Sequence, residues 1–320
     1  MCGVYSTALF PQHRLSAPTG TDSRPGLCPE PPEFHPGAIQ LTGTGETGNM
    51  SEAQVSTVRP IKDASTVMVI RDSDAGPEVF VARRVKGMAF AGWMTVFPGG
   101  GVDSADDDPD LAWTGPAPSW WAERLGCEQS RARRLVCAAA RETFEECGVL
   151  LADHVDGAPV SDAGRYHAAR AELEAHRLTF SRFLATEELS LAAGRLRPFD
   201  HWITPAVEPR RYDTRFFLAA LPGGQEPDDQ TSEVDLTMWA RPADLLDDFR
   251  SGRSMLLPPT WKQLHHLAEF ADVASALASE RPITPIEPEI LEHRDGIRVG
   301  FDGSDEYWAD YQRGHASKKR

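Results

Sequence analysis

Three glutamates near the middle of the chain are spaced so that their carboxylates share one side of a helix. Glu142, Glu145 and Glu146 occupy positions i, i+3 and i+4, which an α-helix places within an arc of about 100°. Like charges this close repel one another unless a cation lies between them, and hard divalent ions such as Mg²⁺ prefer oxygen ligands. Arg141 lies four residues before Glu145, within reach of a carboxylate, and Gly148 follows as a left-handed helix end. The spacing therefore predicts a metal site on the last turns of a helix.

A glycine-rich segment upstream completes the pattern. Gly99, Gly100 and Gly101 follow a β-rich run and precede Asp106. Consecutive glycines are typical of a loop whose backbone must approach another group closely. An apolar run, residues 135–140, comes directly before the glutamates and indicates a buried helix rather than a solvated acidic face.

Together the two segments resemble the signature of the Nudix hydrolases. Gly100 and Asp106 match its first half, with aspartate where the family usually has glutamate, and residues 141–149 match its second half, apart from Thr143 at a usually apolar place. The spacer between the halves, residues 107–140, is much longer than the family's own. A long insertion here is typical of the coenzyme A diphosphatase branch of the family. The downstream segments that also resemble this branch are residues 202–205, 210–218, 233–239 and 256–260, so that the likeness spans residues 65 to about 270.

The resemblance implies an α/β fold, namely the Nudix-type α/β/α sandwich with a mixed β-sheet. It also implies Mg²⁺ or Mn²⁺ as cofactor. The candidate metal ligands are Glu142, Glu145, Glu146, the carbonyl of Gly100 and Glu233. Glu142 is either a ligand or the general base, Glu145 belongs to the same catalytic group, and Arg141 orients carboxylates. Glu233 has the alternative interpretation of a surface residue before a strand.

A carboxylate-bound divalent ion suits the hydrolysis of a phosphoanhydride, P–O–P. For the coenzyme A branch, the substrate would be coenzyme A or acyl-CoA, and the products 3′,5′-ADP and a phosphopantetheine compound. A sugar-nucleotide or dinucleotide such as ADP-ribose or NADH is the alternative, and a catalytically inactive ligand sensor is a third interpretation that the intact glutamates oppose. Arg210 and Arg211 are candidates for binding substrate phosphates, with a solvated turn as the alternative.

The composition excludes some partners. The chain has 320 residues, of which 41% are hydrophobic and 25% charged, with a net charge of −15. An acidic protein is a poor ligand for nucleic acid or an anionic membrane, both of which require a basic surface. None of the five cysteines forms a Cys-x-x-Cys pair, and no secretory signal is visible. We therefore expect reduced thiols, a cytoplasmic location, and a small-molecule nucleotide or CoA partner, whereas the oligomeric state is not predicted.

Three regions are expected along the chain. Residues 1–55 should form a disordered extension, because the first 50 residues hold seven prolines and seven glycines; the alternative is that translation begins at Met50. Residues 60–285 should form the Nudix domain, with the insertion at about 107–134. Residues 286–320 should form a hairpin, through strands at 289–292 and 297–301, and a tail.

Periodicity predicts the elements within the domain. Helices are expected at residues 129–147, 242–250 and 260–277, and a helical region at about 162–191. Strands are expected at residues 66–70, 78–83, 199–204, 214–221 and 234–239. Inside the insertion, Trp113, Trp120 and Trp121 are expected to hold the loop against the core, with stacking on an adenine ring as the alternative.

Overall fold

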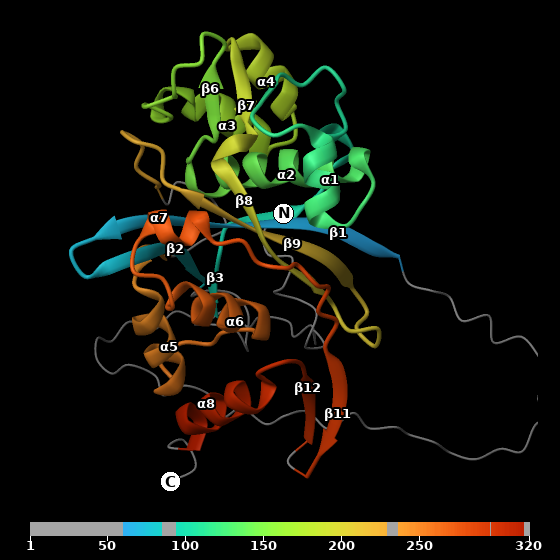
Figure 1. Ribbon diagram of the computed structural model, residues 1–320, viewed down its shortest axis with the longest axis vertical. Coiled ribbons are helices and arrows are strands. Elements are labelled where there is room, and N and C mark those ends of the chain that lie inside the picture. The colour runs from blue at the N-terminus through green and yellow to red at the C-terminus, as the bar shows by residue number, and fades with distance from the viewer. Residues whose placement is uncertain (1–59, 85–93, 229–235, 295, 317–320) are drawn as a thin grey trace, which may run out of the picture.

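A mixed sheet of seven strands lies at the centre of the protein (Figure 1). The computed structural model describes residues 60–84, 94–228, 236–294 and 296–316. The main strands, in spatial order, are β10 (Leu236–Ala240), β2 (Gly76–Arg84), β1 (Ile61–Ser73), β9 (Arg211–Ala220) and β8 (Leu196–Ile203). Two short strands, β3 (Met94–Val96) and β4 (Gly99–Gly101), pair with β2 and β1 respectively. Only β1 and β9 run parallel among these pairs.

Helices cover both faces of this sheet, which confirms the predicted α/β/α sandwich (Figure 1). One face carries α1 (Pro118–Leu125), α2 (Gln129–Cys147), α3 (His167–Glu174) and α4 (Phe180–Thr186). The other face carries α5 (Pro242–Arg250), α6 (Pro258–Leu267), α7 (Val273–Ala278) and α8 (Ser304–Ala316). Within the parts of the chain that the structure describes, no helix is both long and apolar enough to cross a membrane.

The central strand β1 is apolar on both sides because both layers cover it. Val67 and Val69 belong to the core beneath α2, whereas Met68 and Ile70 belong to the core beneath α5 and α6. This alternation follows the two-residue period of a strand. The first part of β1 also contacts α2, because the Ser65 hydroxyl donates to the Leu135 carbonyl at 2.7 Å.

The insertion folds against the core and adds structure of its own. It contains α1 and β5 (Trp113–Thr114), which joins β7 (Leu189–Ala192) and β6 (Ala152–His154) in a second small sheet. Trp121 is fully buried and its ring lies 5.9 Å from that of Phe217 on the main sheet. The other two tryptophans of the insertion, Trp113 and Trp120, pack against the same core. The interpretation that the tryptophans hold the insertion to the core is confirmed.

The helical region predicted at about 162–191 is confirmed up to Thr186, but its last residues form a strand. The structure has a short turn of 3₁₀-helix (Gly164–Tyr166), then α3, α4 and the strand β7. His176 and Glu188 adopt left-handed backbone with φ of 54° and 53°, which ends each helix. Thr179 caps the start of α4 with its side chain. Local caps therefore divide the helical region into two short helices.

Two further differences lie near the C-terminus. The predicted helix at 260–277 is split into α6 and α7, because Asp272 and Ser275 form a capping box that starts a new helix. The segments β11 (Glu289–His293) and β12 (Gly296–Gly300) pair antiparallel where a hairpin was expected. The sequence predicts no helix after this hairpin, yet α8 follows it. Tyr307 of α8 is buried and donates a hydrogen bond to the Leu256 carbonyl at 3.0 Å, so α8 is part of the core.

Candidate active site

The three glutamates lie on the last turns of α2, as the spacing predicts. The helix begins at Gln129 and ends at Cys147, which confirms the predicted bounds. Gly148 has a φ of 72° and its amide donates to the Phe144 carbonyl at 3.0 Å. This is the left-handed end that only glycine adopts without strain. The end of α2 therefore places Glu145 and the neighbouring acid groups beside the part of the sheet where β4 pairs with β1.

Arg141 joins the two halves of the sequence pattern. Its Nε and Nη2 donate to the two oxygens of Asp106 at 2.9 and 3.0 Å. Its Nη1 donates to Glu142 at 2.9 Å and to Glu145 at 3.1 Å, and Nη2 also reaches the Gly101 carbonyl at 2.9 Å. Burial opposes the charge of this guanidinium, but the carboxylates outweigh it and hold the pKa of Arg141 above its usual range. Arg141 thus orients two of the predicted catalytic carboxylates at once.

The glycine segment lies against the side chains of Glu142 and Glu146. It was predicted as a loop; the structure instead makes it the short strand β4, since it completes the pairing of β1. The Gly99 amide donates to Glu146 at 2.7 Å. A Cβ atom at Gly100 would lie 2.5 Å from the carboxylate of Glu142. The absence of a side chain at Gly100 therefore leaves the space that Glu142 occupies.

This site holds more negative charge than its own arginine balances. Asp106, Glu142 and Glu145 are each at least nine-tenths buried around Arg141, and Glu146 follows directly. Burial raises the pKa of Glu142, with Arg141 acting in the opposite direction. Burial also raises the pKa of Glu145 to about 7, again against Arg141 and with Glu142 adding to the increase. A surplus of carboxylate oxygens is the donor set that Mg²⁺ or Mn²⁺ prefers, so the residues present fit a divalent ion.

Protons and a divalent ion should compete at this site. The pKa of Glu145 in the folded protein, about 7, lies above its ordinary value of 4.5, so the metal-free fold loses stability as the pH rises between these values. Metal binding requires the ionised form. We therefore expect Mg²⁺ or Mn²⁺ to raise the Tm more at pH 8 than at pH 6, as measured by calorimetry. Glu145→Gln should flatten this difference, and equal shifts at both pH values in the wild type would contradict the assignment.

Substitution of two adjacent glycines tests whether Gly100 is needed because it leaves space for Glu142 or because it makes the backbone flexible. Gly100→Ala should displace the Glu142 carboxylate, which can swing on a flexible side chain, so the fold should survive while Mg²⁺-dependent activity falls at least tenfold, about the loss typical of a displaced ligand. Gly101→Ala is the matched control, since the nearest atom to its Cβ is the Asp63 carbonyl oxygen at 4.0 Å. Steady-state kinetics and Tm values for both variants test this. Equal activity of the two variants would show that Gly100 has no special role.

The remaining predicted site residues lie apart from this cluster or outside the described residues. Arg211 opens β9 and donates to the Thr204 carbonyl at 3.0 Å and to Glu287. It pairs in register with Ile61, four residues before Ser65, the partner of Gly100, which is about 13 Å along a strand. Arg210 precedes it at an exposed position. Glu233 lies outside the described residues.

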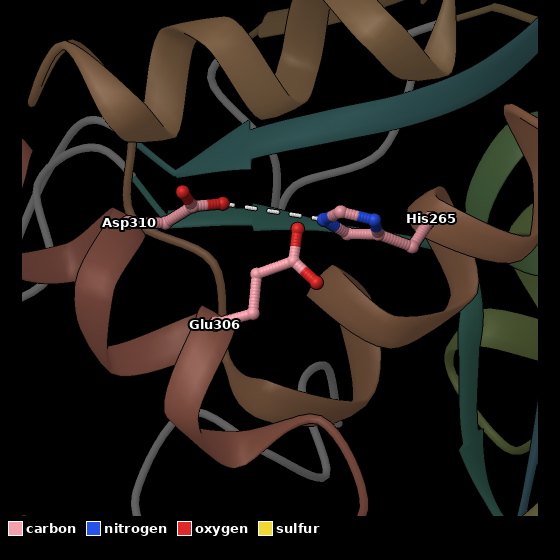
Figure 2. Close-up of side chains that lie close together, drawn as sticks. All are labelled: His265, Glu306 and Asp310. Atoms are coloured by element: carbon pink, nitrogen blue, oxygen red, sulfur yellow. Dashed lines mark ion pairs between the residues drawn. The ribbon is translucent and has the colours of Figure 1, made fainter.

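A second group of possible metal ligands lies on the opposite layer (Figure 2). His265 of α6 and Glu306 and Asp310 of α8 place one ligand atom each within 4.8 Å of one another. Arg250 and Arg313 both form ion pairs with the fully buried Asp310, whose charge is therefore already balanced. Burial lowers the pKa of His265, and its Nε2 lies 4.0 Å from Asp310. We interpret this group as the contact that attaches α8 to α5 and α6.

Comparisons with known proteins agree with the geometry. A family model described as the NUDT19 Nudix domain matches residues 128–267. The acyl-coenzyme A diphosphatase NUDT19 of Xenopus laevis is 24% identical over 273 residues, which cover 73% of this chain and 72% of that protein. The putative nudix hydrolase 7 of Caenorhabditis elegans is 29% identical over 177 residues, covering 55% of this chain and 51% of that protein. A solved NUDIX hydrolase from Alicyclobacillus acidocaldarius is 29% identical, with a TM-score of 0.58 and coverage of 70% of this chain and 98% of that one.

Proposed function

Since this chain belongs to the Nudix hydrolase family, we propose that it hydrolyses the phosphoanhydride of coenzyme A or acyl-CoA with the help of Mg²⁺ or Mn²⁺. The products would be 3′,5′-ADP and a phosphopantetheine or acyl-phosphopantetheine. The observation that carries the proposal is the carboxylate cluster around Arg141, built from two sequence halves separated by a folded insertion. The similarity to proteins named acyl-coenzyme A diphosphatase supports this substrate class.

The residues of the cluster have distinct proposed roles. Glu145 and Glu146 hold the ion, with the Gly100 carbonyl and Glu233 as further candidate ligands. Glu142 either completes the ligand set or takes the proton from the attacking water. Arg141 keeps Glu142 and Glu145 in place through its two Nη1 contacts. When bound, the divalent ion supplies positive charge against the phosphoryl oxygens and favours ionisation of water.

The net negative charge of the chain is compatible with an anionic small molecule, because a bound divalent ion would reverse the local field. The net charge of −15 opposes binding of nucleic acid. The described cysteines, Cys127, Cys137 and Cys147, are free thiols. A cytoplasmic location, inferred from the cysteine pattern, is part of the proposal.

A substrate panel tests the proposal directly. The kcat/KM values for coenzyme A, acyl-CoA, NADH and ADP-ribose would be measured with Mg²⁺ and with Mn²⁺, and the products identified by mass spectrometry. We expect the highest value for coenzyme A or an acyl-CoA, with 3′,5′-ADP as a product. Faster cleavage of ADP-ribose or NADH would assign the enzyme to the sugar-nucleotide or dinucleotide class. No turnover of any of the four, with metal bound, would favour the ligand sensor.

The 3′-phosphate of coenzyme A allows a sharper experiment on Arg210 and Arg211. Loss of a charge-assisted bond to this phosphate should cost about 1.5–3 kcal/mol. One of the two Arg→Ala variants should therefore lose the preference for coenzyme A over 3′-dephospho-CoA while keeping turnover of the latter. Arg211 would exchange Glu287 for the phosphate. Arg177→Ala, at an exposed ion pair with Glu172, is the control; equal rates on both substrates in the wild type would exclude recognition of this phosphate.

A further inference from the structure

The C-terminal end of α2 is held by residues from distant parts of the chain. The last carbonyls of a helix have no partners within it. Here the Phe144 carbonyl accepts from Gly148, the Cys147 carbonyl accepts from the Asp228 amide at 3.0 Å, and the Glu145 carbonyl accepts from the Arg170 Nε at 3.0 Å. The backbone of the turn that bears Glu145 is therefore fixed by a side chain on α3.

Arg170 is buried at this junction. Only 5% of the residue is exposed. Its Nη1 donates to Asp228 at 2.6 Å, and its Nε lies 3.5 Å from Glu174 one turn along α3. Its Nη2 is buried without a hydrogen-bond partner among the described residues. A buried guanidinium with a donor that makes no hydrogen bond stabilises the fold less than an apolar side chain of similar size would.

Arg170 and Asp228 also occupy the space that a side chain at position 148 would need. A Cβ atom at Gly148 would lie 2.9 Å from the Arg170 Nη1 and 3.1 Å from an Asp228 carboxylate oxygen. The glycine thus serves two purposes, the left-handed turn and the space for this ion pair. Three segments, the end of α2, α3 and residue 228 after β9, meet at one point.

The charge of Arg170 suits its position. The C-terminal end of a helix carries partial negative charge, which a cation stabilises. Glu142, Glu145 and Glu146 add three like charges to the same turns and oppose helix formation there. A fixed cation and a fixed hydrogen bond at the Glu145 carbonyl counter this tendency to fray.

We propose that Arg170 is a positioning residue, which holds the last turn of α2 so that Glu145 and Glu146 meet one divalent ion. The inference rests on the proposed metal-binding role of these glutamates. Arg170 contacts the backbone of Glu145 and not its carboxylate, so it acts through the turn. It lies 25 residues beyond Glu145 in the chain and outside the sequence pattern that identifies the site.

Direct metal binding tests the proposal without substrate. The Kd for Mn²⁺ would be measured by electron paramagnetic resonance on wild type, Arg170→Met and Arg170→Lys, well below each Tm. We expect Arg170→Met to raise the Kd about 10–100-fold, as loss of residues that orient metal ligands does. Arg170→Lys should recover part of this loss, because it keeps the charge but only one of the two directed contacts. If Arg170→Met does not fold, a Kd for Arg170→Lys equal to that of wild type would overturn the proposal.

Two controls separate positioning from general stability. Leu173→Ala removes a buried side chain from the same helix and should lower the Tm without changing the Kd for Mn²⁺. Arg177→Met removes an exposed arginine just after α3 and should change neither. A wild-type Kd in Arg170→Met, or the same weakening in Leu173→Ala, would show that Arg170 is only structural. Failure of the wild type to bind Mn²⁺ would instead overturn the metal-site assignment, and binding without coenzyme A turnover would overturn only the substrate.

Discussion

Glu146→Gln is expected to lower kcat with saturating Mg²⁺ by about two to four orders of magnitude, and Glu145→Gln by a similar factor, the range typical for loss of a group that acts on the reacting atoms. Glutamine keeps the shape of glutamate but removes the charge that a divalent ion requires. The fold should survive, because loss of one like charge from the last turns of α2 relieves repulsion. Without metal, the Tm should stay equal or rise. Glu145 is the stronger case, since burial already raises its pKa to about 7.

Kinetics and calorimetry on the same samples check this result. Glu123→Gln, an exposed glutamate on α1, is the control for loss of a negative charge elsewhere. It should have wild-type kcat and Tm. Near-normal turnover of either site variant with Mg²⁺ would remove that glutamate from the proposed ligand set. A collapse of the fold in both would show that the carboxylates serve stability rather than metal binding.

Asp106→Ala should have the largest effect on stability. Asp106 is 1% exposed and accepts from the Arg141 Nε and Nη2 and from the Asp103 amide at 2.8 Å. Its removal leaves the buried guanidinium without its main partner, which typically costs about 3–5 kcal/mol of unfolding free energy. Arg141 would then rely on Glu142 and Glu145 alone, so that kcat should fall as well.

Denaturant unfolding of the metal-free protein measures the free energy, and Mg²⁺-dependent kinetics measure the second effect. Asp107→Asn is the neighbouring control. Asp107 is half exposed in its ion pair with Arg134, and such surface pairs contribute about 0–1 kcal/mol. If Asp106→Ala lost no more stability than Asp107→Asn, the pairing of Asp106 with Arg141 would not be a main support of the site.

Local spacing in the sequence was sufficient to predict the helix and the glutamates at the centre of the site. The helix at 129–147, its end at Gly148 and the shared face of the three glutamates follow from rules that act over one or two turns. The contact of Arg141 with Glu145 is of the same kind, since the two lie four residues apart. The family pattern added Asp106 and Gly100, which lie far from the glutamates in the chain but at recognisable positions.

Local rules failed where several weak signals competed. Apolar spacing suggested one helix at 260–277, but the capping box of Asp272 divides it. The C-terminal helix α8 was missed, although its Tyr307 and Asp310 are buried. The division is itself a local signal, which the apolar spacing outweighed in the prediction. Helix α8 instead depends on packing against α5 and α6, which a single segment does not reveal.

By itself, the sequence determined that a helix ending in a glycine carries three carboxylates beside a glycine-rich segment, because those relations are local or follow a known spacing. Only the tertiary structure decided how these carboxylates are held. The Arg170 contact with Glu145 spans 25 residues and its contact with Asp228 spans 58. Neither residue has a distinctive neighbourhood in the sequence. They meet because the sheet and its helices bring the end of α2, α3 and the segment after β9 together, and contacts of that range depend on the whole fold.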